Sequence, residues 1–138
     1  MIGAYVMTQR DTQEDRTKTD SIGMGLYNID SHHVQRIVLP DGMLENEGDV
    51  EVRTKPYEIP YRSLTPKRAE CENLLVPVCM SASHIAYGSL RMEPQYMIMG
   101  QAAGVAAADA ARRSVAVQDV DLAWLRNRLR EQRQVLSK

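Results

Sequence analysis

The sequence predicts an α+β fold in which short β-strands come first and helices follow. Between residues 21 and 62, short runs alternate apolar with polar side chains, as half-buried strands do. Residues 73–78 are almost continuously apolar, which is typical of a buried strand. After residue 91 the small and apolar residues recur at helical spacing. We therefore expect short strands, a buried strand, a small-residue helix and a C-terminal amphipathic helix.

Composition places the chain among ordinary globular proteins. It has 138 residues, which is enough for a single domain with its own core. Apolar residues make up 43%, and 17 basic and 18 acidic side chains give a net charge of -1. This balance gives no reason to expect a nucleic acid or a membrane surface as partner. The first ten residues do not resemble a signal peptide, and the sequence indicates no compartment.

We divide the chain into three regions. Residues 1–20 end in a wholly polar run and read as a flexible lead-in. Residues 21–62 form a β-rich segment, with a Pro-Asp-Gly turn at 40–42, an exposed acidic connection at 45–51 and an edge strand containing Pro60. Residues 63–138 contain the closing strand and the helices.

Two helices are predicted in the last region. The first begins near Pro94, because proline is tolerated in a first turn, and the second is capped by Asp119 or Asp121. Small residues give the first helix one smooth stripe: Gly100, Ala103, Gly104, Ala107 and Ala111. Two mid-helix glycines cost about 1 kcal/mol each relative to alanine. Either a ligand approaches this stripe closely, or the helix simply packs tightly against a sheet.

A string of motifs resembles a known family. They are Ile-Pro-Tyr-Arg-Ser-Leu at 59–64, Asn-Leu-Leu-Val-Pro-Val-Cys at 73–79, Ser-Ala-Ser-His at 81–84, Arg-Met-Glu-Pro at 91–94 and Gly-Gln-Ala-Ala-Gly-Val-Ala-Ala at 100–107. They stand in the order found in the C-terminal, flavin-contacting segment of FAD-dependent oxidoreductases of the glutathione-reductase type. Residues 21–32 continue the resemblance more weakly. Some relatives carry labels related to xanthan lyase, which point toward carbohydrate metabolism.

The resemblance implies a fragment of an α/β FAD-binding fold, with FAD as cofactor and hydride transfer from an organic substrate. It implies that residues 21–62 are a substrate-side segment and that residues 63–138 are the closing strand and helices of the FAD-binding domain. It implies catalytic roles for His84 and Arg91. The residues it places near the cofactor are Ser83, Gly88, Met92, Glu93, Gly100, Gln101 and Gly104. It also implies a small-molecule substrate, for which carbohydrate derivatives are candidates.

The family's GxGxxG turn for the ADP half of FAD is not found. Gly23 and Gly25 lack a third glycine and a following helix. We therefore expect the N-terminal part of the same enzyme to be a partner. Alone, the chain is expected to be inactive and to bind FAD weakly or not at all.

Other side chains have alternative interpretations. His84 is either a proton-transfer group or a loop histidine bonded to backbone. His32 and His33 are adjacent and point to opposite faces of a strand, so a metal site with Asp30 and His84 is not predicted. Arg62 and Arg91 either hold an anionic group or form ion pairs with Glu58 and Glu93. Cys71 and Cys79 are expected to be free thiols.

A different class of function stays open. The chain could be a non-catalytic interaction module that self-associates through an apolar helix face, giving a homo-oligomer when isolated. A flavin spectrum in the purified protein would favour the enzyme, and concentration-dependent dimerisation without flavin would favour the module.

Overall fold

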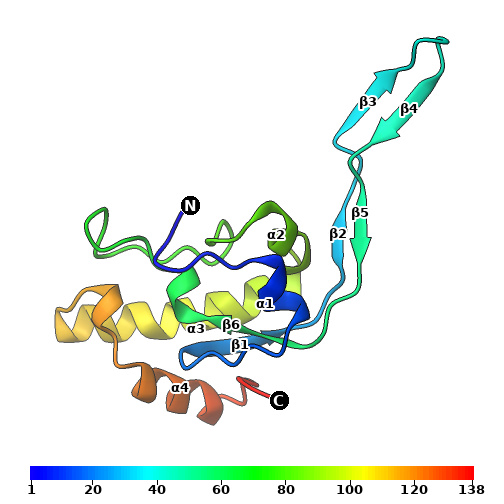
Figure 1. Ribbon diagram of the computed structural model, residues 1–138. Coiled ribbons are helices and arrows are strands. Elements are labelled where there is room, and N and C mark those ends of the chain that lie inside the picture. Colours follow the sequence, from blue (N-terminus) through cyan, green and yellow to red (C-terminus); the bar gives the residue numbers. More distant parts are fainter.

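The computed structural model describes residues 1–138, which form a helical body and a long β-hairpin arm projecting from it (Figure 1). The helices are α1 (Gln9–Gln13), α2 (His84–Leu90), α3 (Glu93–Arg113) and α4 (Leu122–Glu131), with 3-10 turns η1 (Tyr61–Ser63) and η2 (Val117–Asp119). The strands are β1 (Ser21–Gly25), β2 (Ile29–Ser31), β3 (Gln35–Val38), β4 (Leu44–Glu47), β5 (Val50–Val52) and β6 (Tyr57–Pro60). The predicted α+β class is confirmed.

The strands form three antiparallel pairs. β1 pairs with β6 inside the body, whereas β2–β5 and β3–β4 follow one another along the arm, residues 29–52. Gly42 has φ +85° in the turn at the tip, as the Pro-Asp-Gly sequence predicted. The acidic run 45–51 is exposed as expected, but it is not a connection, because most of it is paired in β4 and β5.

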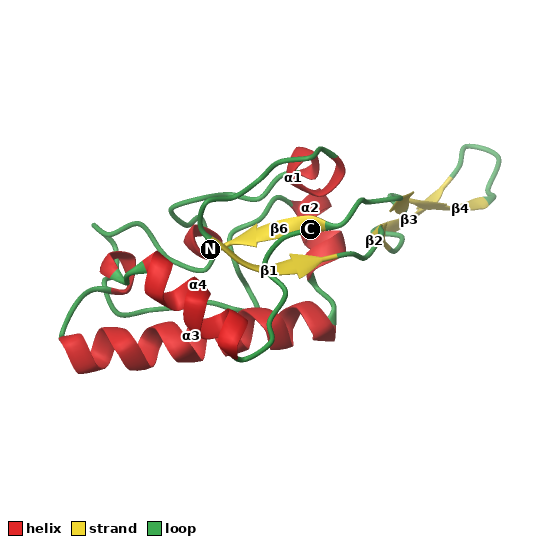
Figure 2. Cartoon of the chain, turned by 90° about the horizontal axis from the view of Figure 1, so that it is seen from below, coloured by secondary structure: helices red, strands yellow, loops and turns green.

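The core lies where α3 packs against the β1–β6 ribbon, with α4 close by (Figure 2). A Cβ at Gly23 of β1 would collide with Ile98 of α3, and a Cβ at Gly25 would lie 2.5 Å from the Tyr57 ring. These two glycines therefore permit close packing of α3 and of the Tyr57 ring against β1.

Both predicted helices are confirmed. α3 has Pro94 in its first turn, and it ends at Ser114 in the left-handed region. Asp121 is the N-cap of α4, and its carboxylate accepts from the backbone N–H of Ala123 at 2.9 Å and of Trp124 at 3.1 Å. None of the helices combines the length and the apolar character that crossing a bilayer requires.

The predicted buried strand at residues 73–78 is wrong. This segment is irregular, and Leu74 and Val78 are 46% and 48% exposed. Its backbone makes two bonds to other segments: the Val76 N–H donates to the Leu64 carbonyl at 2.9 Å, and the Val78 carbonyl accepts from the Tyr87 hydroxyl at 3.2 Å. Pro77 has no N–H to donate, and every strand of this chain is paired with another strand. The apolar run therefore has no partner strand in this chain with which to form a sheet.

Residues 1–20 are not the flexible lead-in that their polarity suggested. They contain α1 and contribute Met7 to the core, and the Asp11 side chain is fully buried. Asp11 accepts from Lys18 Nζ at 2.6 Å and from the Tyr5 hydroxyl at 2.6 Å. Burial alone would raise the pKa of Asp11, but these bonds and those from Thr8 outweigh it and lower the pKa to about 2. A buried ion pair thus anchors the N-terminal segment.

This ion pair makes stability depend on pH. The pKa of Asp11 falls from an ordinary 3.8 to about 2 on folding, so its contribution is complete above about pH 4 and is lost as the pH falls toward 2. We expect urea unfolding to show roughly 2 kcal/mol lost over that range through Asp11 alone. In Asp11→Asn the loss should be smaller by this amount. In the exposed control Glu70→Gln, whose side chain makes no hydrogen bond or ion pair, the loss should match that of the parent chain. Equal losses in the parent and in Asp11→Asn would contradict the assignment.

Candidate functional site

The base of the arm brings three of the predicted site residues together, because α2 packs directly on β2. A Cβ at Gly88 would lie 2.9 Å from the Asp30 carbonyl oxygen, so only glycine lets the helix come this close. Arg91 donates from Nη2 to the same carbonyl at 3.0 Å and lies 3.7 Å from the Asp30 carboxylate. His84 Nε2 is 3.5 Å from the Ser31 hydroxyl. His84, Gly88 and Arg91 therefore all face β2.

The neighbouring predicted residues stand at helix starts. Ser83 is the N-cap of α2, and its hydroxyl accepts from the Ala86 N–H at 3.2 Å. The sequence analysis expected a loop at His84 and missed α2, although a serine followed by three helix-compatible residues was a signal for it. Met92 is the N-cap of α3, and Glu93 is its first residue. Met92 has no side-chain capping bond, so this helix start is open to an outside group.

The remaining predicted residues lie farther along α3, on its exposed face. Gly100, Gln101 and Gly104 share this face with Met97, which is 73% exposed. A Cβ at either glycine would meet nothing within 4 Å, and Gln101 bonds to Gln132 at 2.8 Å. We call the face formed by Met97, Gly100, Gly104, Ala107 and Ala111 the open face of α3. Ala103, which we had placed on this stripe, is instead buried against the core.

Two buried polar atoms near the start of α3 lack partners. They are Arg91 Nε and Gln95 Oε1, and Gln95 as a whole is buried. An unpaired buried polar atom costs about 1–3 kcal/mol. Such a cost is removed when a further molecule or polypeptide supplies the missing partner. Gln95 was not among the predicted residues, and only its position one turn into the helix could have pointed to it.

Tyrosines surround this helix start. The Tyr87 and Tyr96 hydroxyls are 2.8 Å apart, and burial, with the bond to Tyr87, raises the pKa of Tyr96 to about 12. Burial also raises the pKa of Tyr57 to about 12, and its hydroxyl lies 2.7 Å from Ser89 Oγ. Both phenols stay neutral in the physiological range and act as hydrogen-bonding groups of the framework.

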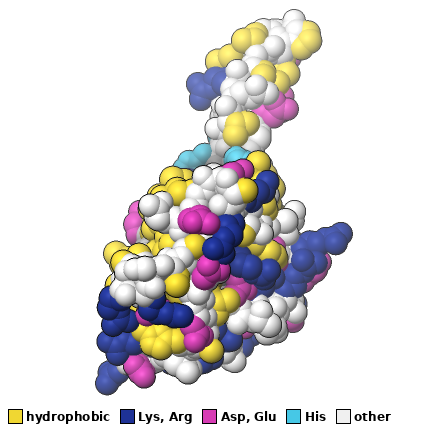
Figure 3. All heavy atoms as spheres, turned by 90° about the vertical axis from the view of Figure 1, so that its left-hand side faces the viewer, with side chains coloured by type: hydrophobic (Ala, Val, Ile, Leu, Met, Phe, Trp, Pro, Cys, Tyr) yellow, Lys and Arg dark blue, Asp and Glu magenta, His cyan; other side chains and the backbone are white.

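Two shallow hollows flank β2, of about 430 and 290 Å³, and both include Asp30 and Glu51. His32 lies 3.7 Å from Asp30 and His33 3.3 Å from Asp49. Figure 3 shows histidines where the arm leaves the body. The structure brings no three His, Cys, Asp or Glu side chains into a metal-binding group. The hollows are lined by hydrogen-bonding groups of both kinds, as a polar ligand requires.

The arginines do not form the ion pairs expected as alternatives. Arg62 grips Asp20 with two nitrogens, at 2.9 and 3.2 Å, rather than pairing with Glu58. Arg91 is bonded to Asp30 rather than to Glu93. Arg62 is thus engaged in the body, whereas the buried Nε of Arg91 has no acceptor.

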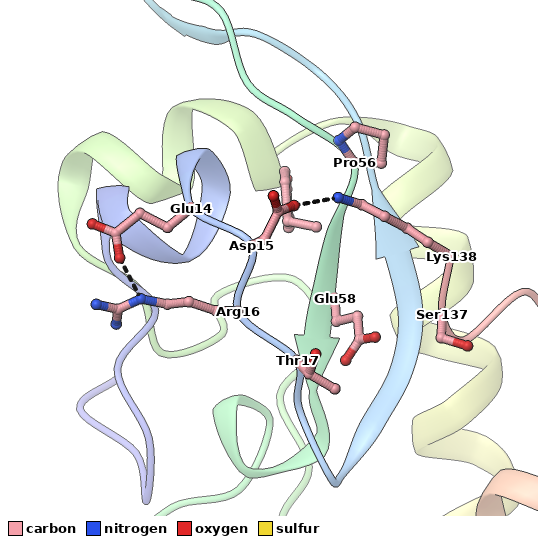
Figure 4. A pocket seen from close by; sticks show the side chains of 9 residues that line it. Glu14, Asp15, Arg16, Thr17, Pro56, Glu58, Ser137 and Lys138 are labelled. Carbon is pink, nitrogen blue, oxygen red and sulfur yellow. Dashed lines mark hydrogen bonds and ion pairs between the residues drawn. The ribbon is translucent and has the colours of Figure 1, made fainter.

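A further hollow of about 390 Å³ lies beside β6, away from the predicted site (Figure 4). Four of its five ionic side chains form pairs: Arg16 with Glu14 at 2.8 Å, and Lys138 with Asp15 at 2.6 Å. The fifth, Glu58, accepts from the backbone N–H of Lys18 at 2.5 Å. None of the predicted site residues lines this hollow.

Comparison with known proteins decides the family. Residues 1–129 match the model of the FAD dependent oxidoreductases. The chain belongs to the FAD-dependent oxidoreductase family. No curated protein and no solved structure matches it. Complete members of this family use FAD, so a flavin is the group that the candidate site should fit.

The residues present fit one wall of a flavin site. The open face of α3 offers two glycines with free space above them, against which a flat ring system can lie closely. The helix start beside it is uncapped by side chains, and Arg91 Nε is a buried donor without an acceptor. The phosphate-binding GxGxxG turn is not among these residues. The fit therefore concerns the ring and not the ADP half.

The two helical glycines Gly88 and Gly104 should respond oppositely to the same substitution. Gly88→Ala should destabilise the chain by about 1–3 kcal/mol, because its Cβ meets the Asp30 carbonyl. Gly104→Ala should stabilise it by about 0.5–1 kcal/mol, because alanine is the better helix former and nothing obstructs it. Urea unfolding of both variants checks the pair. A destabilising Gly104→Ala would show that the open face is covered within the chain itself.

Proposed function

We propose that this chain forms the flavin-ring side of an FAD-dependent oxidoreductase that oxidises a small organic molecule. In this proposal its fold is the C-terminal part of a glutathione-reductase-type FAD-binding domain, completed by the N-terminal part of the same enzyme. The observation that carries the proposal is the open face of α3. Its glycines cost the helix stability and gain nothing from packing inside this chain.

The start of α3 supplies the electrostatics. When bound, FAD supplies an acceptor for the hydride that leaves the substrate carbon. The first turn of α3 offers the backbone N–H groups of Glu93 and Gln95, since Pro94 has none, together with the positive end of a 21-residue helix dipole. Arg91 adds a fixed cation with a free Nε. Groups held in place before the reaction stabilise developing negative charge without reorganising. Such stabilisation lowers the free energy of the transition state by about a few kcal/mol.

His84 is the proposed proton-transfer or substrate-orienting residue. It is exposed at the first position of α2 and lies next to the hollows that flank β2. An imidazole ring has one nitrogen that can accept a proton and one that can donate, which suits either role. Ser83, Met92 and Glu93 place the two helix starts between which a substrate would enter.

The substrate is proposed to be a neutral, hydroxyl-rich molecule, with carbohydrate derivatives as candidates. The hollows at β2 are lined by carboxylates and imidazoles, together with Asn28 and the Tyr27 ring. Carboxylates accept bonds from hydroxyls and repel anions. This favours a polyol over a carboxylic acid as substrate.

The test is a leucine placed on the open face. In the natural polypeptide that carries this sequence, Gly104→Leu should lower the bound FAD per protein by at least about tenfold, because the side chain occupies the space of the ring. Flavin absorbance of the purified protein gives the ratio, and circular dichroism verifies that the variant is folded.

The matched control is Ala111→Leu, two turns toward the C-terminal end of the same face. It adds comparable apolar area to α3 and should leave the FAD content unchanged. If Gly104→Leu is folded and retains its flavin, the placement of this helix against the ring is wrong. If both variants lose flavin equally, the loss reports general disturbance of the face.

The alternative function is an interaction module that uses the same face without a flavin. Met97 on the open face is largely exposed, so the observation that favours a flavin also favours a polypeptide partner. Self-association that is abolished by Met97→Lys, in protein free of flavin, would support this alternative.

A further inference from the structure

The outer hairpin of the arm has two strand edges that pair with nothing. β3 bonds only to β4, in the register Gln35 to Glu47, Arg36 to Asn46, Ile37 to Glu45 and Val38 to Leu44. The outer backbone groups of both strands therefore face away from the hairpin. A two-stranded hairpin without further support is only marginally stable in water. The arm extends beyond the body, so the body does not cover these edges (Figure 1).

The two edges differ in charge. β4 carries Glu45 and Glu47, whereas Arg36 is the single charged residue of β3. The β3 edge also exposes apolar surface, since Val38 is 69% exposed. Charges along an edge are a common protection against pairing with another strand. The β4 edge has that protection, and the β3 edge largely lacks it.

We propose that the β3 edge pairs antiparallel with β3 of a second copy of this chain. The Leu39 N–H donates to the Met43 carbonyl at 2.8 Å, which turns residue 39 toward β4. Hydrogen bonding alternates along an antiparallel ladder, so Ile37 also bonds toward β4, and the backbone groups of Arg36 and Val38 point outward. Self-pairing through those groups places Ile37 opposite Ile37, and Arg36 opposite Val38 of the other copy.

This register is electrostatically acceptable, and the corresponding one for β4 is not. Around Ile37 no like charges face each other, and each Arg36 lies across from an apolar residue. If β4 paired with itself, Glu45 would face Glu45 or Glu47 of the second copy. Like charges directly opposite one another are destabilising. A two-fold related pair of β3 strands is also closed, since each copy uses the same edge.

Charge on the arm as a whole gives the dimer a salt dependence. Residues 29–53 contain six carboxylates and two arginines, so two arms repel each other as they approach. Salt screens this repulsion. The dimer should therefore become tighter as the ionic strength rises, in contrast to an association held by ion pairs.

The experiment measures self-association by sedimentation equilibrium over a range of chain concentrations and salt. The parent chain should dimerise, and Val38→Lys should weaken the dimer at least about tenfold, because it sets a lysine opposite Arg36 of the other copy. The matched control is Leu44→Lys. Leu44 of β4 lies directly across from Val38 and is 63% exposed. The Leu44→Lys substitution therefore adds the same charge on the protected edge. It should have little effect.

A cross-link tests the register independently of stability. With Cys71→Ser and Cys79→Ser as background, Ile37→Cys should form a disulfide-linked dimer on mild oxidation, since opposed residues of a non-bonded pair lie about 4.5 Å apart at Cα. Glu45→Cys, on the other strand opposite Ile37, should not cross-link.

Three results would overturn the proposal. A parent chain that stays monomeric shows that the free edge is not used by a second copy. Equal weakening by Val38→Lys and Leu44→Lys shows that the arm associates through its apolar surface or in an open β3-to-β4 array. A dimer broken by Met97→Lys but not by Val38→Lys lies on the open face of α3 instead.

Discussion

The close packing of α3 on the β1–β6 ribbon is the constraint on which the rest of the molecule depends. Ile98 occupies the space that a side chain at position 23 would fill, so the helix can approach the strand only because that residue is glycine. This contact fixes one side of α3 against the core. The opposite side, with Gly100 and Gly104, is thereby turned outward. The direction of the proposed flavin face thus follows from Gly23, in a strand far earlier in the chain than α3.

Periodicity predicted the parts of the fold that are stabilised within one segment. The start of α3 at Pro94, the Asp121 cap and the turn at Gly42 follow from local chemistry, which the sequence states directly. The strand predicted at 73–78 is wrong because a strand needs a partner strand, and apolar composition does not say whether one is present. The acidic run 45–51 was predicted to be a connection and instead forms strands. Its pairing with β3 and β2 outweighs a composition that disfavours strands.

The site was predictable in kind and not in arrangement. The motifs indicated the candidate residues, and the family match, over residues 1–129, covers all of them. They did not indicate that His84, Gly88 and Arg91 would converge on β2, because the bond from Arg91 to Asp30 joins positions 61 residues apart. Residues 1–20 show the same limit. Asp11 and Lys18 look like solvated polar residues in the sequence. Only the fold reveals that they neutralise each other in a buried pair, to which the Tyr5 hydroxyl donates a hydrogen bond.

The arm also has a mechanical meaning. Two short chain segments connect it to the body, one between β1 and β2 and the other between β5 and β6. Arg91 and Gly88 contact the base of the arm at Asp30. A long, thin ribbon fastened at one end is a lever, so a force at the tip produces its largest torque at that fastening. The fastening lies at the junction of α2 and α3. Whatever grips the tip therefore acts on the alignment of the helix start that the chemistry would use.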